Sequence, residues 1–183
     1  MYRMSEKPLI SADEIRNRVA TLAREIVDAY DYDILLSALT GAYMFTADLS
    51  RELAKAQGPA ALQKKIAFIK ASSYGNSTET SGKLTVTGLE KLNLCGKKVL
   101  LVDDIADTGI TLMHLSQKLS DIGASEVRTC VLLNKQGRRE VEISADFVGF
   151  EIANEFVVGY GLDYAEDYRT LPEIWTLQEI KNG

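Results

Sequence analysis

Apolar residues follow two recurring patterns along the chain. Continuous apolar runs predict strands buried on both faces, and these runs occupy Ile34–Leu39, Ile66–Ala71, Val99–Val102 and Val127–Leu133. Between the runs, apolar residues recur at helical spacing and predict amphipathic helices. The first helix is expected from about Ser11 to Tyr30, because a capping-box pattern, Ser11 with Glu14, precedes its apolar face.

Two further helices are expected after short turns. Phe45, Leu49 and Leu53 define a helical face that follows the turn Thr40-Gly41. The third helix is expected from Thr108 onward, and its apolar face and closing glycine are Leu112, Leu115, Leu119, Ile122 and Gly123. Repeated units of strand, turn and helix predict an α/β fold with a mainly parallel sheet and right-handed crossovers.

The remaining segments are less regular. Residues 72–83 are rich in Ser, Thr, Gly and Asn and predict a loop between strands, from which Lys83–Gly88 returns as a further strand. Phe147–Phe150 and Phe156–Tyr160 have β-type patterns. No internal repeat or linker divides the 183 residues, so a single domain is expected.

Composition narrows the class of protein. The net charge is −5, and the longest basic runs are pairs, which argues against a groove that binds nucleic acid. No apolar run approaches the roughly 20 residues that a membrane helix requires, and Met1–Ile10 lacks the core of a signal peptide. We therefore expect a cytoplasmic protein without a membrane partner. Cys95 and Cys130 are isolated and are expected to be reduced packing residues.

The strand Val99–Val102 leads into the most informative stretch of the chain. Asp103 and Asp104 follow the strand, and a short turn, Ala106–Gly109, then opens the third helix. Ligands of parallel sheets bind at the carboxyl ends of the strands, and the first turn of a helix offers unpaired N–H groups to an anion. The turn and its threonine hydroxyls therefore predict a phosphate site.

Three carboxylates surround this phosphate site. Asp103, Asp104 and Asp107 would repel a bare phosphate unless they held ribose hydroxyls, a proton or a divalent metal. The combination predicts a sugar phosphate whose diol faces the acids.

Val99–Thr111 resembles the phosphoribosyl pyrophosphate signature of the type I phosphoribosyltransferases. The likeness to the purine-salvage branch, the hypoxanthine-guanine phosphoribosyltransferases, extends over nearly the whole chain. It is carried by the stretches Phe45–Leu49 with Arg51–Leu53, Ser72–Gly75, and Asp146–Glu151 through Val157–Ala165.

The resemblance implies a fold and a reaction. The fold is the type I phosphoribosyltransferase fold, with a core at about 11–150 and a small hood, from about 1–10 and 151–183, over the carboxyl edge of the sheet. The reaction is the Mg²⁺-dependent transfer of phosphoribose from phosphoribosyl pyrophosphate to a six-oxopurine, namely hypoxanthine, guanine or xanthine. Family members are dimers or tetramers, so a homodimer or homotetramer is expected.

The resemblance also implies a role for individual residues. The phosphoribosyl group would be bound by Asp103, Asp104, Ala106, Asp107, Thr108, Gly109, Ile110 and Thr111. Asp107 would in addition be catalytic, because it would exchange a proton with a ring nitrogen of the purine. The purine would be bound by Lys135, Phe147, Val148 and Asn154.

The other implied roles concern pyrophosphate, loop closure and metal. Pyrophosphate would be bound by Thr40, Gly41 and Arg169, and Ser73 and Tyr74 would belong to a loop that closes over the reacting centre. Mg²⁺ would be held by Asp103, Asp104 and Asn154, partly through water or substrate.

Two residues depart from the family pattern. Thr40 stands where the family commonly has a cation, and Asn154 stands where it usually has an aspartate. Together they predict an enzyme that favours hypoxanthine over guanine, or one slower than its relatives. They also leave open an alternative, a non-catalytic or weakly catalytic regulator that binds phosphoribosyl pyrophosphate or a nucleotide on the same fold.

Three other classes fit the sequence less well. A receiver domain would have its acids after the first strand, whereas here they follow at least two earlier strands. A dinucleotide-binding fold would need G-x-G-x-x-G, and a P-loop would need G-K-[ST]; the chain has neither motif.

Overall fold

The computed structural model describes residues 2–73, 84–135, 137, 140–141 and 143–179. Its larger sheet has six strands in the order β4-β3-β2-β5-β6-β7. In chain order these strands are β2 (Ile34–Leu39), β3 (Lys65–Ser73), β4 (Leu84–Thr87), β5 (Lys98–Ala106), β6 (Glu126–Lys135) and β7 (Phe147–Ile152). Only β4 pairs antiparallel, which confirms the prediction of a mainly parallel sheet.

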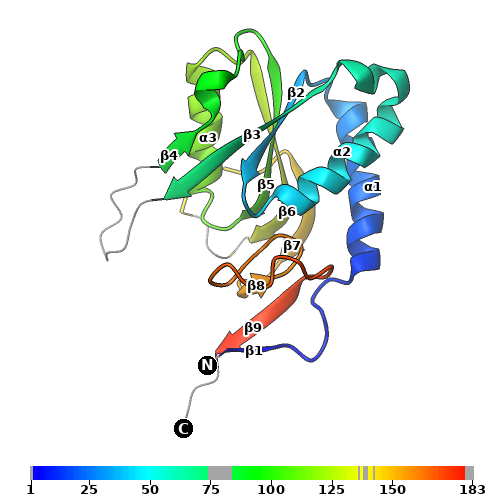
Figure 1. Ribbon diagram of the computed structural model, residues 1–183, viewed down its shortest axis with the longest axis vertical. Helices are drawn as coiled ribbons and strands as arrows, with labels where there is room; N and C mark the ends of the chain where they lie inside the picture. The colour runs from blue at the N-terminus through cyan, green and yellow to red at the C-terminus, as the bar shows by residue number, and fades with distance from the viewer. Residues whose placement is uncertain (1, 74–83, 136, 138–139, 142, 180–183) are drawn as a thin grey trace.

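Three α-helices cover the two faces of this sheet. They are α1 (Ala12–Ala29), α2 (Tyr43–Gln57) and α3 (Ile110–Asp121), and the short 3₁₀ helices η1 (Gly58–Gln63) and η2 (Leu89–Lys91) lie in the connections. Figure 1 shows α1 and α2 on one face and α3 on the other. The predicted capping box is present at α1, where Ser11 and Glu14 each accept from the other's backbone N–H.

The alternation of side chains along the strands explains the two layers of core. Leu35, Leu100 and Val102 pack with α1 and α2, whereas the neighbouring Leu36 and Leu101 pack with α3. Both faces of the central strands are thus buried, as continuous apolar runs predict.

Three short strands from distant parts of the chain form a second sheet. These are β1 (Tyr2–Met4), β8 (Val157–Val158) and β9 (Trp175–Glu179), in the order β1-β9-β8, and both pairings are antiparallel. Figure 1 shows this sheet beyond the lower end of the larger one. We call residues 2–10 and 153–179 the hood.

Several elements extend beyond their apolar runs. Ser72 and Ser73 belong to β3 rather than to the loop, Asp103 to Ala106 continue β5 instead of following it, and Lys135 is the last residue of β6. The reason is that backbone pairing with the neighbouring strand does not require apolar side chains: Asp103 pairs with Val131, and Lys135 pairs with Ile152.

Two elements are shorter in the structure than the sequence predicts. The third helix begins at Ile110 rather than Thr108, because Gly109 at its N-cap has a φ of 85°. Within Phe156–Tyr160, only Val157 and Val158 form a strand, because Gly159 turns the chain back to a bridge with Leu162.

Two compositional expectations can also be compared with the structure. Cys95 and Cys130 are both free; Cys130 is buried, as a packing residue should be, but Cys95 is exposed. Over the part of the chain that the structure describes, no helix is both long and apolar enough to span a bilayer.

Candidate active site

A cavity of about 350 Å³ lies where β2 and β5 end and α3 begins. It brings together ten residues that the sequence singled out, namely Thr40, Gly41, Asp103, Asp104, Ala106, Asp107, Thr108, Gly109, Thr111 and Arg169. All except Thr111 and Arg169 come from the ends of two adjacent parallel strands and the turns that follow them; Thr111 lies in the first turn of α3, and Arg169 reaches the cavity from the hood. The cavity thus lies where ligands of parallel sheets bind.

The N-terminus of α3 forms one wall of this cavity. Its first turn contains no acidic residue, and its N-cap residue, Gly109, has no side chain to cap it. Thr108 Oγ1 accepts from the N–H of Ile110 at 3.4 Å, and the helix offers further backbone N–H groups and the positive end of its dipole. The hydroxyls of Thr108 and Thr111 lie in the same wall. A dianionic phosphate fits this set of donors.

Asp103 and Asp104 form the acidic part of the cavity wall. Asp103 Oδ1 accepts from the N–H of Asp104 at 3.0 Å, and Asp104 Oδ1 accepts from the N–H of Ile105 at 2.8 Å. Burial raises the pKa of both carboxyls, and the neighbouring charge of Asp104 raises the pKa of Asp103 further. Desolvated carboxylates of this kind gain from hydroxyl donors or a cation supplied by a ligand.

Gly41 fits closely against this acidic pair. A Cβ atom at position 41 would lie 1.6 Å from Oδ2 of Asp104, so only glycine leaves room for the carboxylate. The preceding residue, Thr40, is exposed at the mouth of the cavity, and the Leu39-Thr40 peptide is cis. The turn after β2 and the end of β5 are therefore fitted to each other.

Lys135 and Asp107 face each other across the strands β6 and β5. Their Nζ and Oδ2 atoms are 3.6 Å apart, and Lys135 is 5% exposed. The pairing of Ala106 with Asn134 in the sheet brings the two side chains together. Asp107 lines the cavity and Lys135 lies behind it, so the pair places an ammonium donor and a carboxylate acceptor next to the cavity.

Arg169 is held by its own neighbours in the hood. Its guanidinium donates to the carbonyl of Gly161 at 2.8 Å and pairs with Asp163 and Glu166 at 3.0 Å each. Asp163 also lines the cavity, yet sequence reasoning gave it no role. Asp163 lies in the stretch Val157–Ala165 that carries the family resemblance, and this could have pointed to it. A single acid in that stretch, however, does not indicate that it pairs with Arg169.

Some predicted site residues lie apart from this cavity. Ile110 begins α3 without lining it, and among the described residues none of the four predicted purine-binding residues, Lys135, Phe147, Val148 and Asn154, lines it either. Phe147 is 8% exposed in the hydrophobic core, and Asn154 is exposed. For Ser73 only the backbone, in β3, is described, and Tyr74 lies outside the described residues.

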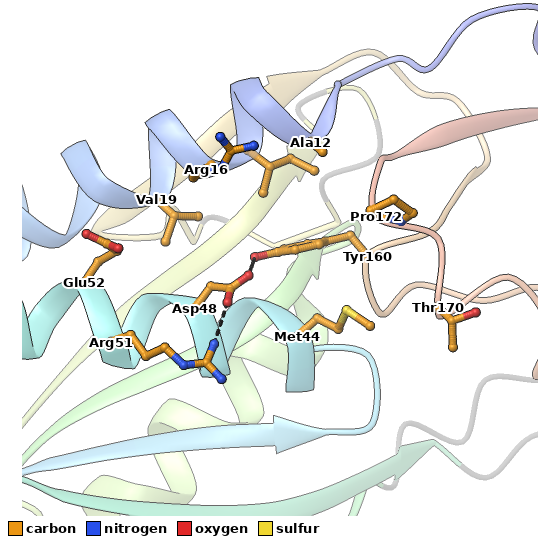
Figure 2. A pocket seen from close by; sticks show the side chains of 11 residues that line it. Ala12, Arg16, Val19, Met44, Asp48, Arg51, Glu52, Tyr160, Thr170 and Pro172 are labelled. Atoms are coloured by element: carbon orange, nitrogen blue, oxygen red, sulfur yellow. Dashed lines mark hydrogen bonds and ion pairs between the residues drawn. The ribbon is translucent and has the colours of Figure 1, made fainter.

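A second cavity, of about 450 Å³, lies between α1, α2 and the hood. Figure 2 shows Tyr160 extending across it toward Asp48 of α2, which also pairs with Arg51. None of the predicted site residues whose side chains the structure describes lines this cavity. The cavity with the larger volume is therefore not the one that contains the predicted site.

A parallel α/β sheet with an anion-binding helix terminus next to paired acids defines a protein that binds a phosphorylated sugar. Comparison with known families agrees, because residues 11–165 match the phosphoribosyl transferase domain. The chain belongs to the phosphoribosyltransferase family and, within it, to the hypoxanthine-guanine phosphoribosyltransferases.

Relatives of known name support this assignment along almost the whole chain. The hypoxanthine-guanine phosphoribosyltransferase of Aquifex aeolicus is 38% identical over 94% of this chain and 95% of its own length. The hypoxanthine phosphoribosyltransferase of Escherichia coli is 39% identical over 91% of this chain and 92% of its own.

Solved structures show the same fold. The hypoxanthine phosphoribosyltransferase of Trypanosoma cruzi in complex with the product IMP superimposes with a TM-score of 0.85, at 37% identity, and covers 97% of each chain. The type I phosphoribosyltransferase fold expected from the resemblance is therefore confirmed.

Proposed function

We propose that this enzyme transfers the phosphoribosyl group of phosphoribosyl pyrophosphate to a ring nitrogen of hypoxanthine, giving IMP and pyrophosphate. The observation that carries the proposal is the cavity in which the N-terminus of α3 faces Asp103 and Asp104. The names of the relatives, and the IMP bound to one of them, support hypoxanthine as the base. Guanine and xanthine are the other six-oxopurines to be tested.

Lys135 and Asp107 would bind and activate the base. The Lys135 ammonium would donate to the exocyclic oxygen of a six-oxopurine, whereas the amino group of adenine would place a donor against a donor. Asp107 would take a proton from the ring nitrogen that forms the new bond, or share it. Phe147 would stack on the base, and the backbone of Val148 would meet its edge.

Arg169 and the turn after β2 would hold the leaving pyrophosphate. The guanidinium lies on the cavity wall with Thr40 and Gly41. It would neutralise the negative charge that develops on pyrophosphate as its bond to the sugar breaks. In this structure Arg169 pairs with Asp163 and Glu166, so pyrophosphate would share or replace these carboxylates. Ser73 and Tyr74 would belong to a loop that excludes water during transfer.

The donor set is compatible with Mg²⁺. Neither Asp103 nor Asp104 takes part in an ion pair between described residues, and both are desolvated carboxylates with hard oxygen ligands. The described residues contain no cluster of three or more metal-ligating side chains, which suits an ion that takes its other ligands from water and substrate. Asp103 and Asp104 would hold an ion that supplies charge neutralisation to the pyrophosphate, and the amide oxygen of Asn154, which lies apart from this cavity, would help to hold a second ion through water or substrate.

The proposal includes the organisation of the protein. We expect one domain, with a core at about 11–150 under the terminal segments at about 1–10 and 151–183, assembled as a homodimer or homotetramer. Light scattering coupled to size-exclusion chromatography would measure the number of chains.

A second candidate function is a weakly catalytic or non-catalytic sensor of phosphoribosyl pyrophosphate. It is favoured by the engagement of Arg169 with Asp163 and Glu166, and by an exposed amide, Asn154, where an aspartate is usual. A sensor would bind the sugar phosphate without forming nucleotide.

Product formation and ligand binding, measured on the same preparation, separate the two functions. We expect IMP from hypoxanthine and phosphoribosyl pyrophosphate with Mg²⁺, no AMP from adenine, and a loss of turnover in Asp107→Asn. The matched control is Asp121→Asn, at the other end of α3, which should keep its turnover. Tight binding of phosphoribosyl pyrophosphate without IMP would support the sensor instead.

A further inference from the structure

Strand β7 is the edge of the larger sheet and begins with the two residues assigned to the base. Phe147 pairs with Cys130, and Val148 pairs with Val131, so one side of β7 is bonded to β6. No described strand lies on its other side. The backbone of an edge strand lacks one of its two neighbours and needs another restraint to stay in place.

Gly149 makes this restraint more important. A Cβ atom at position 149 would lie 2.4 Å from the carbonyl oxygen of Leu132, so the close fit of β7 to β6 requires glycine. Glycine is also the residue with the greatest backbone freedom. The most flexible residue of β7 therefore directly follows Val148, whose backbone the proposed function places against the purine.

Arg18 of α1 supplies contacts to both residues. Its Nε atom donates to the carbonyl of Gly149 at 2.7 Å, and one terminal nitrogen donates to the carbonyl of Val148 at 2.7 Å. The five donors of a guanidinium lie in one rigid plane, so a single side chain fixes two successive carbonyls.

Glu25, also on α1, orients the same guanidinium. Its two oxygens accept from the terminal nitrogens of Arg18 at 2.8 and 3.0 Å, and this pairing lowers the pKa of Glu25. The carboxylate of Glu25 neutralises the charge of Arg18. The guanidinium therefore acts on β7 through the direction of its hydrogen bonds rather than through its net charge. The two residues form a brace between α1 and the edge strand.

We propose that Arg18 is a positioning residue for the purine. It holds the carbonyls of Val148 and Gly149, and so keeps the backbone of Val148 and the ring of Phe147 in place for the base. The inference rests on the proposed function, because it is that function which assigns the base to Phe147 and Val148. It adds a residue on a helix that contributes nothing to the wall of the cavity.

Steady-state kinetics that separate the two substrates test the proposal. We expect Arg18→Gln to raise KM for hypoxanthine at least about tenfold, because each hydrogen bond to a charged group is worth roughly a tenfold change. KM for phosphoribosyl pyrophosphate should stay within about twofold, since its proposed site lies at the ends of β2 and β5, at the start of α3 and at Arg169. Arg18→Lys should rescue little, because an ammonium cannot bridge both carbonyls in one plane.

Two controls distinguish positioning from a general loss of structure. Arg16→Gln removes an exposed arginine from the same helix and should leave both KM values unchanged. Arg18→Ala in the presence of ethylguanidinium should regain part of its affinity for hypoxanthine, which a merely destabilised fold would not do. Glu25→Gln keeps the arginine but removes the carboxylate that orients its guanidinium. If Arg18→Gln fails to fold, this second variant should still raise KM for hypoxanthine by a few fold.

An unchanged KM for hypoxanthine in folded Arg18→Gln, or an equal rise in both KM values, would overturn the positioning role. A wild-type enzyme that forms no IMP would instead overturn the proposed function, whatever Arg18 does. The wild-type measurement therefore comes first.

Discussion

The ammonium of Lys135 lies 3.6 Å from the carboxylate of Asp107, so the two residues assigned to opposite tasks at the base are partners before any base is bound. Lys135 is 5% exposed, and a buried ammonium without a counter-charge would be costly. Asp107 thus supplies the counter-charge for this ammonium. When a six-oxopurine arrives, the same ammonium would turn its donors to the exocyclic oxygen.

Lys135→Gln should lower kcat/KM for hypoxanthine by about a hundredfold, because a charged hydrogen bond to the base is worth roughly 1.5–3 kcal/mol. It should also weaken the discrimination against adenine, since an amide oxygen accepts from an amino group. Initial rates with each base would measure both effects. Lys118→Gln, on α3, is the control and should change neither; full activity of Lys135→Gln would remove Lys135 from the base site.

Gly41→Ala should weaken the binding of phosphoribosyl pyrophosphate. The new Cβ would lie 1.6 Å from Oδ2 of Asp104, so the carboxylate or the turn must move. Calorimetric titration with phosphoribosyl pyrophosphate and Mg²⁺ should show at least about a tenfold loss of affinity, or roughly 1.4 kcal/mol.

The control for Gly41→Ala is Gly96→Ala. Position 96 has a φ of 69° but open space for a Cβ, so alanine there should cost stability without touching ligand affinity. If Gly41→Ala binds as tightly as the wild type, the fit between Gly41 and Asp104 has no functional consequence.

Much of this site could be predicted because its residues are consecutive. Asp103 to Thr111 lie on one strand, one turn and one helix, so spacing alone brings their side chains together. The partnership of Arg169 with Asp163 was not predictable, because a turn of the hood determines it. The contacts of Arg18 could not be predicted either. From the sequence, an arginine at that position is expected to be solvated, and only the position of the edge strand β7 beside α1 shows that it donates to two carbonyls.

Asp103→Asn should stabilise the metal-free protein at neutral pH. The folded pKa of Asp103 is raised, so the folded state binds more protons than the unfolded state between the ordinary pKa, near 3.8, and the raised value. Stability therefore falls as pH rises through this window, and asparagine avoids that loss.

Thermal unfolding of Asp103→Asn and wild type, at pH 7.5 and at pH 4 with a chelator, measures the effect. We expect the variant to melt higher at pH 7.5, by roughly 2–4 °C for each kcal/mol gained, and to lose this advantage toward pH 4. The same variant should bind Mg²⁺ and phosphoribosyl pyrophosphate more weakly. A variant that melts lower than wild type at pH 7.5 would contradict a desolvated, destabilising carboxylate.

The departures at Thr40 and Asn154 predict a preference among bases. Hypoxanthine should be used faster than guanine at ordinary Mg²⁺ concentrations. Thr40→Lys and Asn154→Asp should each lower the Mg²⁺ concentration needed for half-maximal rate, because each restores a charge that the family usually has. Rates with hypoxanthine, guanine and xanthine over a Mg²⁺ titration decide the matter. Guanine as the fastest substrate, or an unchanged Mg²⁺ dependence in both variants, would leave these departures without effect.

Tyr160→Phe should loosen the contact between the hood and α2. The Tyr160 hydroxyl donates to Asp48 at 2.7 Å across the second cavity (Figure 2), and the next residue, Gly161, lies so close to the carbonyl of Gly41 that a Cβ would come within 2.0 Å of it. Loss of the bond should cost about 1 kcal/mol, which corresponds to a melting point roughly 2–4 °C lower.

Because Gly161 also accepts from Arg169, the loosened contact should reach the pyrophosphate site. We expect Tyr160→Phe to raise KM for phosphoribosyl pyrophosphate by a few fold and to leave KM for hypoxanthine nearly unchanged, the opposite pattern to Arg18→Gln. Asp48→Asn keeps an oxygen acceptor for Tyr160 and should have a smaller effect on both the melting point and KM. If Tyr160→Phe lowers the melting point without changing either KM, the hood holds Arg169 in place independently of α2.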